Sequence, residues 1–197
     1  MGTDKAVAQL GGGALVDRAL AILRSAGLST AVIAGARQDL AEFGPVIEDP
    51  GSGPLGGICA GLESTEAAYA LFLPVDMPLL PPELLTALLG RMERTGAGIT
   101  LASLGGFAQT FPVVIEQSLA LGLRAELRSG NDGCFSAFRS ATARARRSLE
   151  IVSVENLVQS GLVEDPRGLP PAFWFTNVNT PNDLAKAEAI LAGHHVS

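Results

Sequence analysis

The chain has few cysteines, few lysines and no long apolar run. Its 197 residues include two cysteines, Cys59 and Cys134, which lie far apart and lack the spacing of metal ligands. We therefore expect both to be reduced packing residues in a cytoplasmic protein. No apolar run approaches the ~18 residues of a transmembrane helix, and the N-terminus shows no signal-peptide pattern. These absences argue against a membrane protein.

The charge balance argues against nucleic acid as a partner. The formal net charge is −6, and only two of the basic residues are lysines, Lys5 and Lys186. Anionic substrates would therefore have to be held by particular cations. Six arginines lie close together and could bind a substrate phosphate, although a solvated helix face is the simpler interpretation: Arg124, Arg128, Arg139, Arg144, Arg146 and Arg147.

The hydrophobic pattern predicts a three-layer α/β/α sandwich with a mainly parallel sheet, as a single domain over residues 1–197. Short apolar or β-branched runs predict strands at Ala6–Leu10, Thr30–Ala34, Val46–Ile47, Ala70–Val75, Gly98–Leu104, Phe111–Ile115, Ile151–Val154 and Phe173–Val178. Helical spacing of apolar residues predicts helices at Leu15–Ala26, Gln38–Phe43, Ile58–Ser64, Pro82–Thr95, Gln117–Leu127 and Asn182–Leu191.

The stretch Leu71–Met77 is the one around which the candidate site is organised. The apolar run Ala70–Val75 ends in a single carboxylate, Asp76, which is followed by prolines. In open α/β sheets, ligands bind beyond the carboxyl ends of the strands. A lone Asp there can hold Mg²⁺, whose shell is completed by substrate phosphates and water. The alternative is that Asp76 caps the helix that begins near Pro82.

Two glycine-rich stretches are candidates for a phosphate-binding loop. Gly11–Gly13 lacks the spacing of the known dinucleotide and triphosphate motifs, so we expect a simple turn. Gly51–Gly57 has four glycines in the sequence G-S-G-P-L-G-G and directly precedes a predicted helix. Such a turn can bring backbone N–H groups close to a ligand, but it can also be an ordinary loop.

Three segments together resemble one family. They are M-G-T-D-K at the start, E-D-P-G-S-G-P-L-G-G-I followed by F-L-P-V-D-M-P, and F-T-N-V-N-T-P-N-D-L near the end. In this order and spacing they are similar to the molybdenum cofactor guanylyltransferases, the MobA-like group of the nucleotidyltransferase superfamily. The resemblance implies transfer of GMP from GTP to the phosphate of molybdopterin-bound molybdenum cofactor, with Mg²⁺ and release of pyrophosphate. Molybdoenzymes or their chaperones are further partners that it implies.

The resemblance also assigns roles to residues. Lys5 neutralises the triphosphate and Asp76 holds Mg²⁺, so these two are the expected catalytic residues. Asn177 and Asn179 lie on the pterin side, where their alternation with Val178 at the end of a predicted strand turns both toward the same side. The residues expected at the nucleotide are Lys5, Asp49, Gly53, Pro54, Leu55, Gly57 and Asp76.

The sequence departs from the family pattern in two places. The family signature runs L-x-G-G-x-S-x-R-M-G-x-D-K, and this sequence begins at its Met, without the first strand and most of the phosphate loop. Either the start was assigned too far downstream, which the match elsewhere favours, or the chain is a degraded relative. Ala34 stands where the family commonly has an asparagine, and losing that hydrogen bond costs about 1 kcal/mol.

Two other functions compete with this interpretation. The related cytidylyltransferase for the same cofactor would use a similar fold. A non-catalytic relative that binds the cofactor or a partner enzyme would explain the absent loop. A dinucleotide-binding protein is disfavoured, because no G-x-G-x-x-G follows any predicted strand.

Overall fold

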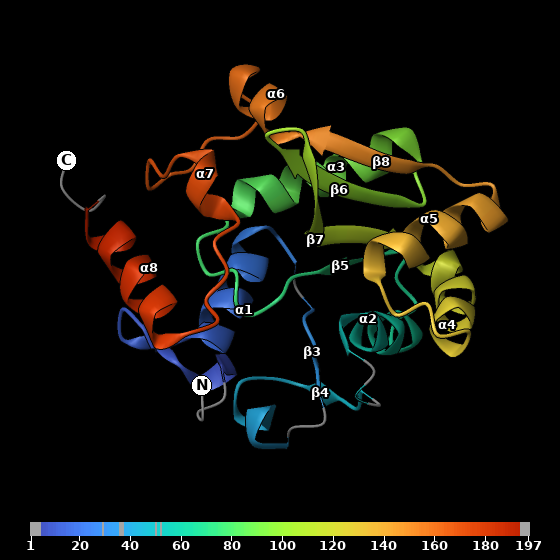
Figure 1. Cartoon of the computed structure of the whole chain (residues 1–197), viewed down its shortest axis with the longest axis horizontal. Helices are drawn as coiled ribbons and strands as arrows, with labels where there is room; N and C mark the ends of the chain where they lie inside the picture. Colours follow the sequence, from blue (N-terminus) through green and yellow to red (C-terminus); the bar gives the residue numbers. More distant parts are fainter. Residues whose placement is uncertain (1–4, 29, 36–37, 50, 52, 194–197) are drawn as a thin grey trace.

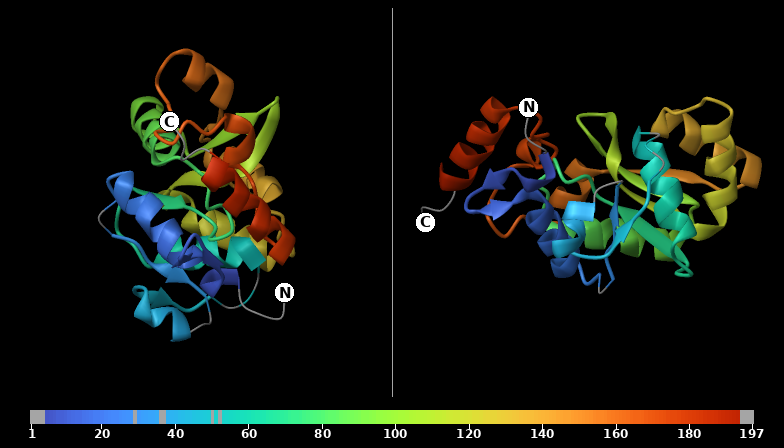
Figure 2. Two further views of the ribbon diagram at one scale, coloured as in Figure 1. Left: turned by 90° about the vertical axis from the view of Figure 1, so that its left-hand side faces the viewer. Right: turned by 90° about the horizontal axis from the view of Figure 1, so that it is seen from below.

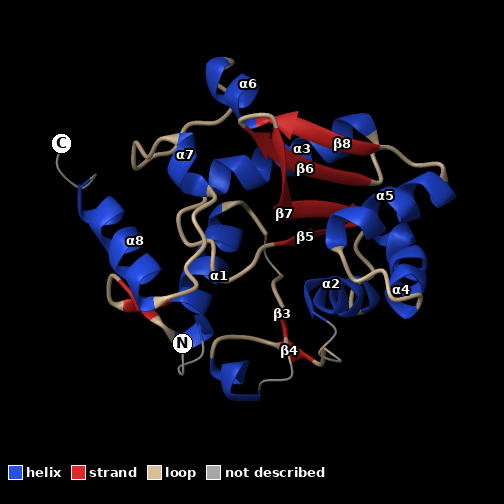
Figure 3. Cartoon of the chain, in the orientation of Figure 1, coloured by secondary structure: helices blue, strands red, loops and turns tan. Residues whose placement is uncertain are grey.

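The computed structural model describes residues 5–28, 30–35, 38–49, 51 and 53–193 (Figures 1 and 3). The strands are β1 (Gln9–Leu10), β2 (Gly13–Ala14), β3 (Ile33–Ala34), β4 (Val46–Ile47), β5 (Tyr69–Phe72), β6 (Ile99–Leu104), β7 (Phe107–Glu116) and β8 (Leu149–Ser153). The helices are α1 (Leu15–Ser25), α2 (Gly53–Glu63), α3 (Pro82–Thr95), α4 (Ala120–Arg128), α5 (Cys134–Ala145), α6 (Val154–Gln159), α7 (Pro171–Trp174) and α8 (Pro181–Gly193). Short 3₁₀ turns cover Lys5–Val7 (η1), Gln38–Glu42 (η2) and Gln117–Leu119 (η3).

The main sheet has the strand order β5-β7-β6-β8 and is mixed. β6 and β8 are parallel neighbours, whereas β7 is antiparallel to both β5 and β6. Strands β5, β6 and β8 therefore share one direction, as predicted, and β7 alone runs against them. The cause is local: Gly105 and Gly106, both with positive φ, join β6 to β7, and so short a connection can only form an antiparallel hairpin.

Helices cover both faces of this sheet, which confirms the predicted layers. Successive residues of a strand point to opposite faces. Ile99 and Leu101 of β6 and Val113 of β7 pack into a core with α2, α4 and α5. Thr100 and Val114 face the other way, toward α3. Figure 1 shows α3 behind the sheet, and the views in Figures 1 and 2 place α8 and the α4–α5 pair at opposite ends of the molecule.

Strand β5 is shorter than predicted. It ends at Phe72, where the prediction extended to Val75, because Pro74 has no N–H group to donate to a neighbouring strand. Among the described strands β5 pairs only with β7, so it forms an edge of the sheet. Two small pairs lie apart from it: the β1–β2 hairpin, which turns at Gly11 and Gly12 within the predicted turn Gly11–Gly13, and the parallel pair β3–β4.

The predicted last strand, Phe173–Val178, is wrong. Pro171 begins the short helix α7, as proline does well in the first turn of a helix. Trp174 is buried, and its Nε1 donates to the carbonyl of Leu169 at 2.8 Å.

Helix α5 was not predicted at all, although its Ala137 and Phe138 are fully buried against α4 and the sheet.

Most of the glycine-rich stretch 51–57 belongs to helix α2 rather than to a loop. Glycines of α2 allow close packing of this helix against its neighbours. A Cβ at Gly57 would lie 3.5 Å from the Cβ of Ala34, and a Cβ at Gly61 would lie only 2.7 Å from Cε1 of Phe72. The absent side chains let α2 approach β3 and β5 closely.

We expect Gly61→Ala to lower the free energy of unfolding by about 1 kcal/mol. Crowding against Phe72 costs about 2 kcal/mol, and the better helix propensity of alanine returns about 1 kcal/mol. Gly122→Ala in α4 is the matched control, because its Cβ would meet Ala141 at an ordinary 3.6 Å. That variant should be stabilised in urea denaturation, and equal effects at both glycines would contradict the close packing of α2.

Candidate functional site

Three residues from distant segments meet beyond the carboxyl end of β5. Lys5 begins η1, Asp76 follows β5, and Asn179 precedes α8. The Nζ of Lys5 donates a hydrogen bond to Oδ1 of Asn179 and lies 4.0 Å from Oδ2 of Asp76. The predicted cation and the predicted metal-binding carboxylate are therefore neighbours. We call these three residues the Lys5 cluster.

The Lys5 cluster is held by a backbone contact and is open to solvent. The backbone N–H of Val178 donates to the carbonyl of Asp76 at 2.8 Å, which ties the segment before α8 to the segment after β5. The Lys5 side chain is 43% exposed and that of Asp76 24%. A substrate can therefore reach both charged groups from solvent.

The N-terminus of α8 is closed by a reciprocal cap. Oδ2 of Asp183 accepts hydrogen bonds from the N–H of Asn179 at 3.2 Å, from the N–H of Thr180 at 2.9 Å and from the Thr180 hydroxyl at 2.8 Å. The N–H of Asp183 in turn donates to the Thr180 hydroxyl oxygen at 3.2 Å. The hydroxyl of Thr180, followed by these backbone N–H groups, lowers the pKa of Asp183. Asp183 was not predicted, although T-P-N-D has the spacing of a capping box.

A second group of residues surrounds Asp49, near the ends of β3 and β4. Oδ1 of Asp49 accepts a hydrogen bond from the N–H of Gly51 at 3.1 Å. A Cβ at Gly57 would lie 3.6 Å from Oδ2 of Asp49, so the carboxylate, Ala34 and the glycine of α2 lie together. We call these three residues the Asp49 cluster.

The remaining predicted residues occupy different surroundings. Gly53 and Pro54 are exposed at the start of α2. The Leu55 side chain is fully buried in the core with Ile58 and Leu62, which leaves only its backbone for a ligand. Asn177 is exposed and does not bond to the Lys5 cluster in the described part of the chain. No hydrogen bond or ion pair of the described residues joins the Lys5 cluster to the Asp49 cluster.

Several of the clustered arginines are engaged in ion pairs. Arg124 contacts both carboxylate oxygens of Glu63, at 2.8 and 2.6 Å. Arg144 pairs with Glu126 at 2.7 Å. The Nε of Arg147 donates to Oε2 of Glu116 at 2.7 Å. These partners support the simpler interpretation that this group forms a solvated face.

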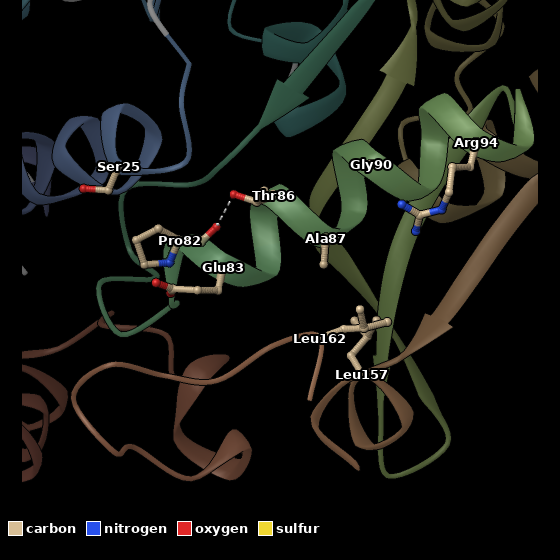
Figure 4. A pocket seen from close by; sticks show the side chains of 9 residues that line it. All are labelled: Ser25, Pro82, Glu83, Thr86, Ala87, Gly90, Arg94, Leu157 and Leu162. Atoms are coloured by element: carbon tan, nitrogen blue, oxygen red, sulfur yellow. Dashed lines mark hydrogen bonds between the residues drawn. The ribbon is translucent and has the colours of Figure 1, made fainter. Parts of the chain in front are cut away.

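A cavity between α3 and α6 lies outside both clusters (Figure 4). It is lined by Glu83, Thr86 and Arg94 of α3 and by the apolar side chains of Leu157 and Leu162. One carboxylate oxygen of Glu83 is buried without a hydrogen-bond partner among the described residues. None of the predicted site residues lines this cavity.

The part of the chain that the structure describes contains neither a cluster of metal ligands nor a membrane-spanning helix. In residues 5–28, 30–35, 38–49, 51 and 53–193, no group of three or more His, Cys, Asp or Glu side chains is placed to hold a metal ion. Within the same residues, none of the helices is long and apolar enough to cross a membrane. Asp76, which lies beside the ammonium group of Lys5, therefore belongs to no such group of three among the described residues.

Comparison with solved structures defines the class of protein. Molybdopterin-guanine dinucleotide biosynthesis protein A from Archaeoglobus fulgidus superimposes with a TM-score of 0.75 at 22% identity, covering 98% of this chain and 92% of that one. The fold is therefore that of the nucleotidyltransferases.

Sequence comparison then identifies the family. The MobA-like NTP transferase domain matches residues 1–147, and the chain belongs to that family. The molybdenum cofactor guanylyltransferase of a Shewanella species (strain W3-18-1) is 33% identical over 134 residues, 66% of this chain and 68% of its relative. The probable molybdenum cofactor guanylyltransferase of Haloferax mediterranei is 28% identical over 194 residues, 93% of this chain and 84% of its relative. The family predicted from the three motifs is confirmed.

Neither cysteine has the environment of a nucleophile. Burial raises the pKa of Cys134 to about 11, and burial likewise raises the pKa of Cys59. Thiolates, not thiols, react with electrophiles. Both side chains pack in the core shared with α4 and α5, so they contribute apolar contacts.

We expect Cys134 to resist alkylation at pH 8 in the folded protein. At that pH a thiol with a pKa near 11 is only about 0.1% thiolate, and the fraction rises about tenfold per pH unit. Because the pKa is raised on folding, the stability linked to this thiol is present below about pH 8.5 and is lost as the pH rises toward 11. Iodoacetamide labelling followed by peptide mass spectrometry measures the rate, with the urea-unfolded chain as the fast control. Equal rates in the folded and unfolded chains would contradict the burial of Cys134.

Proposed function

We propose that this chain transfers GMP from GTP to the phosphate of molybdopterin-bound molybdenum cofactor and releases pyrophosphate. The observation that carries the proposal is the Lys5 cluster, which joins an ammonium group, a carboxylate and an amide beyond the carboxyl end of β5. The names of the relatives from Shewanella and Haloferax support this choice of substrates.

The residue types suit nucleotidyl transfer. Such reactions need positioning and charge neutralisation more than covalent catalysis. Lys5 supplies one positive charge for the triphosphate. The acceptor phosphate is already anionic at neutral pH, so no general base has to remove a proton from it. The unreactive environments of Cys59 and Cys134 are consistent with this chemistry.

Asp76 fits the requirements of Mg²⁺ in such a reaction. Mg²⁺ is usually bound by one or two carboxylates together with water and substrate phosphates. Asp76 is a partly exposed carboxylate next to the lysine proposed to bind those phosphates. When bound, the ion would neutralise charge on the triphosphate. Asp76 would hold it, and Lys5 and Asn179 would orient the phosphates around it.

The Asp49 cluster favours guanine over cytosine. Guanine presents two adjacent donors, N1–H and the 2-amino group, which one carboxylate can accept together. Cytosine presents an acceptor, N3, at the corresponding edge, which a carboxylate would repel. Gly57 and Ala34 lie beside Asp49 and carry no polar side chain that would compete for its carboxylate. Gly53, Pro54 and the backbone of Leu55 would complete the nucleotide side, and Asn177 with Asn179 would face the pterin.

We expect Asp76→Asn to lower the rate of GMP transfer at least about 100-fold, because the amide cannot replace the charge of a metal ligand. The assay follows pyrophosphate release from GTP in the presence of molybdopterin-bound cofactor and Mg²⁺. Asp132→Asn, at an exposed turn residue far along the chain, is the matched control and should retain the rate of the unaltered protein. An active Asp76→Asn protein would exclude Asp76 as the metal ligand.

We expect Asp49→Asn to weaken GTP binding about tenfold, because one charge-assisted hydrogen bond to guanine is lost. CTP binding should not weaken, because the substitution removes the repulsion between the carboxylate and cytosine N3. Calorimetric titration with each nucleotide and Mg²⁺ measures both affinities. Preference of the unaltered chain for CTP would favour the cytidylyltransferase alternative. A folded chain that binds neither nucleotide would favour the non-catalytic relative.

A further inference from the structure

The cap of α8 and the Lys5 cluster share one residue. The side-chain Oδ1 of Asn179 accepts a hydrogen bond from the ammonium group of Lys5. The backbone N–H of Asn179 donates to Oδ2 of Asp183 at 3.2 Å. The same carboxylate oxygen of Asp183 holds the backbone and the hydroxyl of Thr180. The conformation that presents the Asn179 side chain is therefore fixed from the α8 side by Asp183.

Val178, which precedes Asn179, is also held in place. Val178 is fully buried, and its N–H donates to the carbonyl of Asp76 at 2.8 Å. Asn179 thus lies between two anchors, one on the segment after β5 and one on the first turn of α8. The first anchor is a backbone contact available to any sequence, whereas the second depends on one side chain.

We propose that Asp183 is a positioning residue for the reaction, acting through Asn179 to hold Lys5 beside Asp76. No hydrogen bond or ion pair in the described part of the chain joins Asp183 to Lys5 or Asp76, so its role is positioning. Its carboxylate fixes the backbone from which the Asn179 amide reaches Lys5. The kinetic consequence of this role rests on the proposed function, but the effect on Lys5 itself does not.

The first readout is the chemical accessibility of Lys5, measured without any nucleotide. Acylation with an N-hydroxysuccinimide ester, followed by peptide mass spectrometry, gives the rate at Lys5. Asp183→Ala should raise this rate about fivefold, because a hydrogen bond that engages the amine is weakened. Asn179→Ala should raise it by a similar factor. Asp183→Glu, which keeps a carboxylate suited to a capping box, should stay close to the unaltered protein.

The second readout is the transfer assay. Asp183→Ala should lower kcat about fivefold, because Lys5 is held less well at the reacting phosphates. The KM for GTP should rise by a smaller factor, because Lys5 is only one contact to the nucleotide and the guanine side of the site is unaltered. If Asp183 acts through Asn179, then adding Asp183→Ala to Asn179→Ala causes no further change in either readout. Additive effects, or an unchanged rate of Lys5 acylation in Asp183→Ala, would overturn the proposal.

A matched cap controls for general loss of stability. Ser153 caps α6 by accepting a hydrogen bond from the N–H of Asn156 at 3.2 Å, far from the Lys5 cluster in the sequence. Ser153→Ala should lower the melting temperature as Asp183→Ala does, yet leave Lys5 acylation and kcat unchanged.

Asp183→Asn is the milder variant and should change the acylation rate of Lys5 and kcat in the same directions as Asp183→Ala. The chain could transfer no GMP and still show faster Lys5 acylation in Asp183→Ala, with no further increase in the double variant with Asn179→Ala. That result would refute the proposed function and support the role of Asp183 in positioning Lys5.

Discussion

The hydrogen bond between the N–H of Val178 and the carbonyl of Asp76 is the contact on which the candidate site depends. It joins segments that are about a hundred positions apart in the sequence, and it lies where β5 has ended and α8 has not begun. The side chains on either side of it, Asp76 and Asn179, then meet Lys5 from the start of the chain. A charged pair open to water contributes little to stability by itself. The buried apolar residues of the core, including Val178, therefore hold the ends of these segments in place.

Close packing of α2 is the second constraint, and it acts on the nucleotide side. The helix is apolar around much of its surface, and Gly57 and Gly61 lie one turn apart on the side that faces β3 and β5. The approach that these glycines permit brings Asp49 close to α2. A stretch that resembles a flexible phosphate loop is thus largely the start of a helix.

The two clusters divide the proposed reaction between them. The Asp49 cluster offers the hydrogen-bond acceptors of one carboxylate, whereas the Lys5 cluster offers an ammonium group beside a second carboxylate. Neither cluster contains a serine, cysteine or histidine, and burial raises the pKa of both cysteines elsewhere in the fold. Acceleration would have to come from orientation and charge neutralisation, the contributions that dominate phosphoryl transfer. That requirement explains why the anchors behind Asn179 matter as much as the residues that would touch substrate.

The sequence alone determined the layers, the family and the identity of most candidate residues. Periodicity of two and of 3.6 residues is a local property, so α1, α3, β6 and β8 could be predicted close to their observed bounds. Short family motifs are also local in the sequence, and they identified Lys5, Asp49, Asp76 and Asn179 as candidate residues. The tertiary structure decided what depends on partners distant in sequence: the reversed direction of β7, the edge position of β5, the helical state of Gly53–Gly57 and the replacement of the last strand by α7. Only the tertiary structure showed that Lys5 meets Asn179 and Asp76, because hydrogen bonds between distant segments leave no periodic trace in the residues that make them.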